Sequence, residues 1–205
     1  MLESLKTLDT RLFLFLNGFH FTILDQIMWM ASNPFFWIPL YIWFLWLLFR
    51  AQKTNFWLVI LSIIIMIVIS DQLCNFFKFE VMRLRPSNEP TLKPLIHLLN
   101  GYSGGTYGFY SAHASNSFAF ATFIFMLVKR KNGYLIPILL TYALLASYSR
   151  IYLGVHYPGD VITGIILGVL IGAGMGKLFY WLTVRLKKRE NRQKAVKDIN
   201  GDSIN

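Results

Sequence analysis

The sequence predicts an all-α membrane protein: a polytopic bundle of five transmembrane helices, preceded by an N-terminal amphipathic helix that lies in the membrane interface. Of the 205 residues, 55% are hydrophobic, and the mean hydropathy of the chain is +0.48. A soluble domain of this length is less apolar. The apolar residues also form long runs separated by polar segments, and each run approaches the roughly 20 residues that a helix needs to cross hydrocarbon.

Five apolar runs are the candidate transmembrane helices. They cover residues 34–49, 55–74, 114–128, 134–149 and 161–184. The shorter runs can borrow apolar flanks to reach spanning length. The last run contains glycines at a spacing that permits close packing against a neighbouring helix, namely Gly164, Gly168, Gly172, Gly174 and Gly176. The single cysteine, Cys74, lies within an apolar run and excludes an internal disulfide.

The first 32 residues differ from these runs, because polar residues are interspersed among apolar ones. Apolar side chains recur at helical spacing, at Leu5, Leu8, Leu12, Phe15 and Phe19. Residues 1–32 are therefore expected to form an interfacial helix region. A six-span alternative, in which residues 12–30 cross the membrane, would have to bury Asn17, His20, Asp25 and Gln26. We expect no cleavable signal peptide, because acids occur early and no small-residue cleavage site follows a clean apolar core.

The basic residues predict the orientation of the bundle. Arg50 and Lys53, the run Lys129-Arg130-Lys131 and the segment after Arg185 all fall on one side of a five-span chain, which the positive-inside rule assigns to the cytoplasm. Residues 33–184 are then the membrane-embedded domain, and residues 185–205 are a basic cytoplasmic tail. The net charge of +10 is spread between the apolar runs in this way, so it does not indicate a nucleic-acid partner.

Three polar clusters fall on the opposite, outer side. In the first, Lys78 and Arg85 are seven residues apart, so two helical turns would make them face the same way, and Pro86 would end the helix. The second is the segment 110–113, Tyr-Ser-Ala-His. There Ser111 is a candidate N-cap of the third span, whose free backbone N–H groups would form an anion site.

The third cluster is the most informative, because it places an Arg, a His and an Asp at membrane depth, where charge is costly. His156 and Asp160 are four residues apart, the spacing at which two side chains meet on one helix face. A carboxylate beside an imidazole fixes its tautomer and raises its basicity, as a histidine nucleophile requires. Arg150 offers a planar cation suited to phosphate oxygens. We therefore predict a phosphate site whose nucleophile is His156, and we expect this histidine to be exposed at the membrane interface.

The three clusters resemble the motifs of the type 2 phosphatidic acid phosphatase superfamily. In chain order they read Lys-x6-Arg-Pro, Ser-x-His and Ser-Arg-x5-His-x3-Asp. Its members are integral membrane lipid phosphatases and their soluble relatives. The resemblance covers roughly residues 30–184. The second motif departs from the family pattern Pro-Ser-Gly-His, because Tyr110 replaces the proline and Ala112 the glycine. Alanine keeps the backbone N–H but adds a methyl group, which affects the fit of the substrate rather than the chemistry.

The resemblance implies a role for each site residue. His156 would attack phosphorus and form a phosphohistidine, Asp160 would orient it, and His113 would protonate the leaving oxygen and then activate water. The phosphate oxygens would be held by Lys78, Arg85, Ser111, Ala112 and Arg150. Phosphoryl transfer mainly needs in-line positioning and charge stabilisation, and three cations can supply the latter. We therefore expect neither a metal nor a cofactor.

These observations predict a metal-independent phosphatase of the cytoplasmic (inner) membrane, with its active site on the periplasmic or extracellular face. Its substrate would be a phosphate mono- or diphosphate ester of a membrane lipid. Length and five-span layout make the resemblance closest to short bacterial members that act on polyprenyl diphosphates such as undecaprenyl diphosphate. Phosphatidylglycerol phosphate, phosphatidic acid and the lipid A phosphates are the alternatives.

Two other classes of function are less well supported by the residues. A non-catalytic lipid-phosphate binder or transporter would need only the cations, so the presence of His113, His156 and Asp160 argues against it. An oxidative relative that holds vanadate is disfavoured by the apolar runs, because such relatives are mostly soluble. The sequence leaves open the oligomeric state, and whether residues 87–110 are a lid over the site or a plain connection.

Overall fold

The structure, a computed structural model, describes residues 2–128 and 133–202. Within these ranges the chain is all-helical, with one isolated bridge between Leu84 and Tyr107. The α-helices are α1 (Leu2–Gly18), α2 (Thr22–Ser32), α3 (Ile38–Ala51), α4 (Phe56–Val81), α5 (Ala112–Leu127), α6 (Leu135–Tyr152) and α7 (Pro158–Asp202). Short 3₁₀ turns precede α3 and α4 and interrupt the long connection between α4 and α5.

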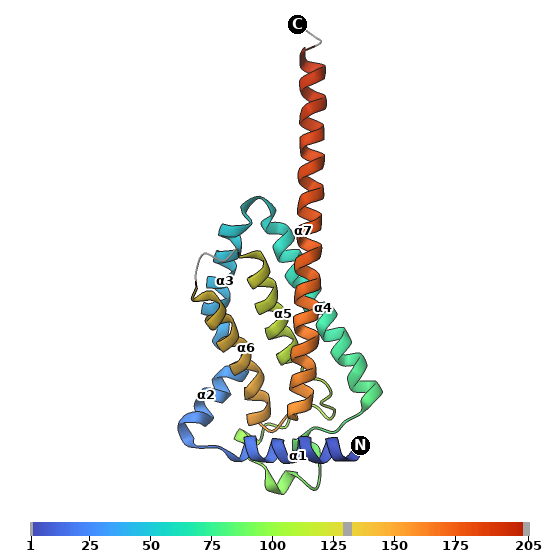
Figure 1. The fold of residues 1–205 in the computed structure, drawn as a ribbon. Helices are drawn as coiled ribbons and strands as arrows, with labels where there is room; N and C mark the ends of the chain where they lie inside the picture. The colour runs from blue at the N-terminus through green and yellow to red at the C-terminus, as the bar shows by residue number, and fades with distance from the viewer. Residues whose placement is uncertain (1, 129–132, 203–205) are drawn as a thin grey trace.

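The prediction of an all-α polytopic membrane bundle is confirmed. By length and composition, four helical segments of the described chain are able to cross a membrane: Pro34–Ala51, Lys53–Val81, Leu135–Tyr152 and Pro158–Lys194. The third predicted run is α5, a shorter apolar helix of 16 residues. Helices α3 to α7 lie side by side, with α5 near the middle (Figure 1). The buried core of this bundle is built from Phe, Leu, Ile and Met side chains of α3, α4, α5, α6 and α7.

The glycines of α7 bring this helix into backbone contact with α5. A Cβ atom at Gly168 would lie 2.3 Å from the carbonyl oxygen of Ser115, and one at Gly172 would lie 2.3 Å from that of Ala119. A Cβ at Gly164 would lie 2.6 Å from the carbonyl oxygen of Ser111. Any larger residue would push the two helices apart. The predicted close packing is confirmed for these three glycines, which fix the start of α5 against the start of α7, whereas a Cβ atom at Gly174 would meet nothing within 4 Å.

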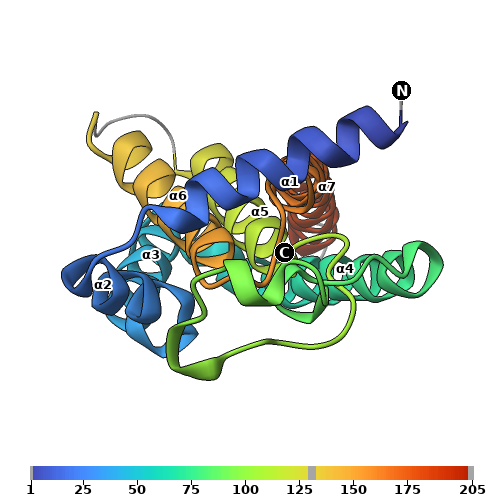
Figure 2. The same ribbon diagram turned by 90° about the horizontal axis from the view of Figure 1, so that it is seen from below.

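The N-terminal residues form two helices rather than one. α1 and α2 meet at a bend of 116° after Gly18, and α1 lies across the end of the bundle, below α6 and α7 (Figures 1 and 2). The apolar residues Leu5, Leu8, Leu12 and Phe15 are exposed on α1, as an interfacial helix requires, and Phe19 is exposed just after it. Residues 12–30 therefore make no straight crossing, and the described chain has a fifth long candidate span only if the bent pair α1–α2 is one broken span.

One of the polar residues in this region, Asn17, is buried although residues 12–30 make no straight crossing of the membrane. The side chain of Asn17 is 1% exposed, and its amide donates to the carbonyl oxygens of Tyr152 at 2.7 Å and His97 at 3.1 Å. The Asn17 side-chain oxygen accepts from the backbone N–H of His97 at 2.8 Å. Asn17 therefore ties α1 to the end of α6 and to the connection between α4 and α5.

At the other end, α7 continues as one helix beyond the bundle (Figure 1). The residues predicted as a basic tail thus begin as a helical extension of the last span. The basic run Lys129-Arg130-Lys131, which supported the predicted orientation, lies outside the described residues.

Candidate active site

The three predicted clusters meet at one end of the bundle. The start of α5, the end of α6, the start of α7 and the connection between α4 and α5 converge there, on the side that α1 crosses (Figure 2). Two backbone contacts fix this meeting point. The N–H of Ser111 donates to the carbonyl oxygen of Asp160 at 3.1 Å, and the N–H of Ser87 donates to that of Gly154 at 3.0 Å.

Arg85 reaches the site from a loop, not from a helix. α4 ends at Val81, and Met82 adopts a left-handed conformation with φ of 46°. The prediction that Lys78 and Arg85 share a helix face is therefore wrong, and so is the prediction that Pro86 ends the helix, because the helix stops earlier. Lys78 stays in the last turn of α4, half-buried, while the backbone of Arg85 is extended and donates to the carbonyl oxygen of Thr106 at 3.1 Å.

The guanidinium of Arg85 is buried under the loop that follows it. Its Nε donates to the carbonyl oxygen of Tyr107 at 3.1 Å, and its Nη1 donates to that of Val155 at 3.3 Å. Gly104 has a φ of +64°, and a Cβ atom there would lie 2.9 Å from Arg85 Nη1. This position therefore needs glycine both for its backbone conformation and for room above the guanidinium.

His156 lies in the connection between α6 and α7 and is only 3% exposed. The expectation of an exposed histidine is wrong, because the chain folds back here: the N–H of His156 donates to the carbonyl oxygen of Arg150 at 3.2 Å. Arg85 Nη1 lies 3.3 Å from His156 Nε2. Since a guanidinium can only donate, Nε2 carries the lone pair and the proton of the neutral ring sits on Nδ1.

Asp160 faces that protonated nitrogen. Its Oδ2 is 3.6 Å from His156 Nδ1 and accepts from the backbone N–H of Tyr157 at 3.0 Å. The two residues do not share a helix face as predicted, because α7 begins at Pro158. The pKa of His156 is held well below its ordinary value by burial, and then by the charges of Arg85, Arg150 and Lys78. A neutral imidazole whose lone pair lies on Nε2 has the form of a nucleophile.

Arg150 completes the cationic wall around His156. It occupies the last turn of α6, is 3% exposed, and donates from Nη2 to the hydroxyl of Tyr102 at 3.1 Å. Its Nε has no hydrogen-bond partner in the described structure. The pKa of Arg85 is lowered by burial and by the charge of Arg150. Two buried guanidinium groups that repel each other form a site suited to an anion.

The second motif supplies the start of α5. Ser111 is the N-cap, as predicted, and its hydroxyl accepts from the N–H of Ala114 at 3.4 Å. Ala112 opens the helix, so its backbone N–H lies at the positive end of the helix dipole. His113 follows, half-buried, and lines a cavity of about 400 Å³ together with Tyr41, Ile67 and Phe120.

Arg83 and Asp9 belong to the site, and the sequence did not reveal them. Arg83 donates from Nη1 to Asp160 Oδ1 at 2.9 Å and from Nη2 to Asp9 Oδ2 at 2.7 Å, and it lies 3.7 Å from the ring centre of Tyr157. Asp9 Oδ1 accepts from the N–H of Gly159 at 2.8 Å. Arg83 could have been noticed as a further cation beside Arg85, but its partners lie too far away in the chain to leave a pattern.

Comparison with known proteins identifies the family. Residues 56–186 match the PAP2 superfamily. The chain is 39% identical over 196 residues to a lipid A 4'-phosphatase of Bacteroides thetaiotaomicron, covering 92% of this chain and 83% of the relative. It is 33% identical over 186 residues to a lipid A 4'-phosphatase of Porphyromonas gingivalis, covering 90% and 78%.

Two solved structures share the fold. The crystal structure of Aquifex aeolicus LpxE superposes with a TM-score of 0.62 at 29% identity, covering 83% of this chain and 95% of that one. A PAP2 type phosphatidylglycerolphosphate phosphatase from Bacillus subtilis gives a TM-score of 0.64 at 22% identity, covering 85% and 86%. The resemblance found in the motifs is thus confirmed: the chain belongs to the PAP2 superfamily and is a membrane-embedded lipid phosphatase.

Proposed function

We propose that this protein removes a phosphate from lipid A, and that the group removed is the 4'-phosphate. The support is the likeness to two lipid A 4'-phosphatases over most of both chains. This proposal replaces the predicted preference for undecaprenyl diphosphate, which rested on chain length and span number alone. Lipid A phosphates were among the alternatives that the sequence left open.

The observation that carries the chemistry is the neutral, buried His156 facing two guanidinium groups. In the first step, Nε2 of His156 forms a bond to phosphorus while the bond from phosphorus to the sugar oxygen breaks. Asp160 Oδ2, 3.6 Å from Nδ1 in the resting site, moves closer and accepts a hydrogen bond from Nδ1–H, so the ring keeps the correct tautomer and its positive charge is stabilised as it forms. The Arg85 donor that contacts Nε2 turns to a phosphate oxygen, which frees the lone pair for attack.

The remaining residues complete the reaction. His113 gives a proton to the leaving sugar oxygen and then takes one from water, which attacks the phosphohistidine and releases inorganic phosphate. Lys78, Arg150, the hydroxyl of Ser111 and the N–H of Ala112 hold the phosphate oxygens. The apolar cavity beside His113, about 400 Å³ and lined by residues such as Leu45, Ile63 and Phe120, has the size and character to take part of an acyl chain.

The site is proposed to face the periplasm from the inner membrane. The turn from α3 to α4, which carries Arg50 and Lys53, lies at the end of the bundle opposite the site (Figure 1), where the positive-inside rule places the cytoplasm. The exposed apolar residues of α1 would then rest in the outer leaflet.

The experiment is a side-by-side assay of phosphate release by the purified protein in one detergent. Lipid A, undecaprenyl diphosphate, phosphatidic acid and phosphatidylglycerol phosphate are offered at equal surface concentration, with the His156→Gln variant as control. We expect the highest kcat/KM on lipid A, and mass spectrometry of the product should place the loss on the distal glucosamine. A higher kcat/KM on undecaprenyl diphosphate, or loss of the phosphate from the other sugar, would overturn the assignment.

A further inference from the structure

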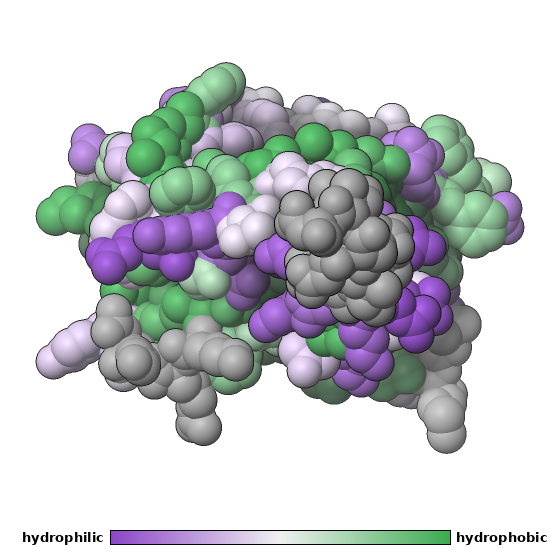
Figure 3. Space-filling model, turned by 90° about the horizontal axis from the view of Figure 1, so that it is seen from above, coloured by the Kyte–Doolittle hydropathy of each residue, from purple (hydrophilic) through white to green (hydrophobic). Residues whose placement is uncertain are grey.

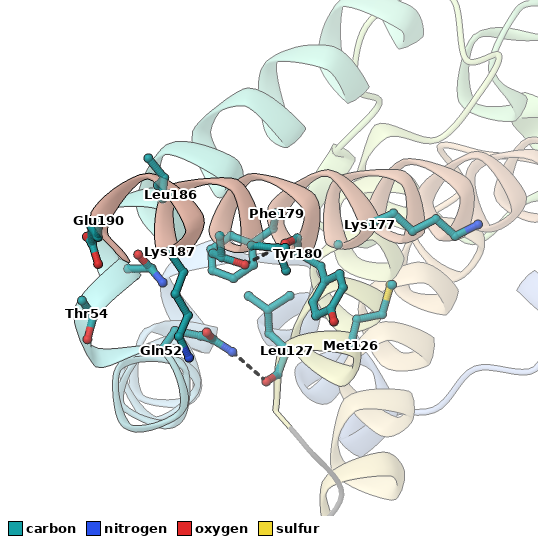
Figure 4. A pocket seen from close by; sticks show the side chains of 14 residues that line it. Gln52, Thr54, Met126, Leu127, Lys177, Phe179, Tyr180, Leu186, Lys187 and Glu190 are labelled. Carbon is teal, nitrogen blue, oxygen red and sulfur yellow. Dashed lines mark hydrogen bonds between the residues drawn. The ribbon is translucent and has the colours of Figure 1, made fainter. Parts of the chain in front are cut away.

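A second pocket opens at the other end of the bundle, far from His156. It has a volume of about 680 Å³ and lies between the turn from α3 to α4, the end of α5 and one face of α7 (Figure 4). Lys177, which lines it, is 19 residues after Pro158, so the helical rise places it roughly 28 Å along α7. This is close to the thickness of the hydrocarbon core, about 30 Å, so the pocket is at the opposite membrane surface.

The floor of the pocket is apolar. Leu127 and Phe179 are almost fully buried beneath it. Gly176 leaves room for Met126 to lie against α7, since a Cβ atom at this glycine would be 2.6 Å from the sulfur of Met126. An apolar floor of this kind is suited to hydrocarbon.

The rim is polar and carries positive charge. Thr54, Asn55 and Gln52 line it from the turn between α3 and α4, and Lys187 lines it from α7. Both Gln52 and Lys187 line the pocket in Figure 4, and the side-chain amide of Gln52 donates to the carbonyl oxygen of Leu127 at 3.2 Å. Glu190 is the acidic residue in the lining. Among the residues that the structure describes, Lys187 has no ion-pair partner.

The surroundings place this rim at the level of lipid headgroups. Trp181 and Tyr180 are exposed on α7, and aromatic residues of this kind mark the membrane–water interface. The guanidinium of Arg185 stacks on Trp181, 3.9 Å from its ring centre, and that of Arg50 lies 5.1 Å from that of Trp46. Hydrophilic residues surround the base of the projecting α7 on this face (Figure 3).

The charge of this region also favours an anion. Six basic residues fall within 185–194, against the single acid Glu190. The positive-inside rule alone explains cations in such a position. It does not explain a preformed pocket with an apolar floor, a cation and uncharged hydrogen-bonding groups on one rim.

We propose that this pocket binds an acidic phospholipid of the leaflet opposite the active site. The phosphate rests between Lys187 and the polar side chains of the turn from α3 to α4, and one acyl chain lies over Leu127 and Phe179. Such a lipid ties α7 to the ends of α3 and α5, where α7 leaves the bundle. The proposal does not depend on which lipid the active site hydrolyses.

The test is a titration of the purified full-length protein with phosphatidylglycerol or with phosphatidylcholine of the same chains, read by native mass spectrometry. We expect phosphatidylglycerol to bind more tightly. Lys187→Gln should weaken its binding about fivefold, the equivalent of about 1 kcal/mol per basic residue near an anionic surface. Lys188→Gln is the matched control, because it removes the same charge one residue away and outside the lining. It should leave the affinity nearly unchanged.

A second variant separates the pocket from general surface charge. Thr183→Trp fills the pocket without altering charge, since Thr183 lines it and is half-buried, and it should also remove the preference for phosphatidylglycerol. Neither Lys187→Gln nor Thr183→Trp should change phosphate release from lipid substrate in detergent. The proposal would be overturned if Lys187→Gln and Lys188→Gln lost equal affinity for phosphatidylglycerol, or if the wild type bound both lipids equally. It would also be overturned if the lipid-free protein were a dimer that Thr183→Trp dissociates.

Discussion

Arg83 offers the sharpest test of how the site is held together. Its guanidinium bridges Asp160, which has no exposed surface, and Asp9 of α1. If Arg83 is replaced by Gln, the carboxylate of Asp160 keeps the backbone N–H of Tyr157 as its donor but loses its charged partner. Breaking a buried ion pair in this way costs about 3–5 kcal/mol. Part of that cost will appear as a lower unfolding temperature, and part as misplacement of His156.

The catalytic consequence follows from the role of Asp160. Loss of the aspartate that orients a catalytic histidine lowers kcat by about 10⁴-fold in a well-studied triad, so a carboxylate that is present but displaced should cost on the order of 10²-fold. KM should change little, because Arg83 does not line the phosphate position. Asp9→Asn is the control. Asp9 and Arg83 are both partly exposed, and ion pairs of this kind contribute only about 1 kcal/mol to the free energy of unfolding, so this variant should lose little stability.

The assay is phosphate release by Arg83→Gln, Asp160→Asn and the double variant in one detergent. If Arg83 acts through Asp160, the two changes are not additive, and Arg83→Gln should add little in the Asp160→Asn background. Arg83→Lys should recover only part of kcat, because an ammonium cannot span both carboxylates as a planar fork does. Additive losses, or an Arg83→Gln protein with more than about half of the wild-type kcat, would refute a positioning role.

Three further predictions concern metal independence, pH and orientation. Activity should persist in EDTA and be blocked by vanadate; loss in EDTA that Mg²⁺ restores would contradict this. The contribution of His156 to the unfolding free energy should fall as the pH drops below about 6.5, because its lowered pKa keeps the folded form from taking up the proton that the unfolded form binds. In melts at several pH values, the difference between the wild type and His156→Gln should change by at most about 1.4 kcal/mol per pH unit. With Cys74 replaced by Ala, an impermeant thiol reagent should label Lys93→Cys but not Lys53→Cys in spheroplasts, and the reverse pattern would invert the topology.

The transmembrane part of the fold was predictable because lipid imposes a simple pattern. A span must be apolar along its length and satisfy its backbone internally, so each apolar run became a helix. The glycines of α7 also predicted a close partner, although not that the partner would be α5. The bend after Gly18 was not predictable, since Asn17 is satisfied by carbonyl groups far away in the chain, such as that of Tyr152.

The site residues were found for reasons that were only partly correct. The arguments from helix spacing placed Lys78 beside Arg85 and His156 beside Asp160, yet α4 ends at Val81 and α7 begins at Pro158. The residues meet because loops fold back onto the helix ends, and loop conformation leaves no periodic pattern in a sequence. The pairing of Arg83 with Asp9 was missed for the same physical reason.

The measurement that tests the central claim most directly is the capture of the covalent intermediate. The protein is mixed rapidly with lipid A, quenched at alkaline pH, where phosphohistidine is stable, and mapped by mass spectrometry of its peptides. The account predicts a phosphate on His156 in the wild type, and none in the His156→Gln variant, which should release no phosphate from lipid A. A phosphate on another residue, or turnover that continues in His156→Gln, would contradict the account.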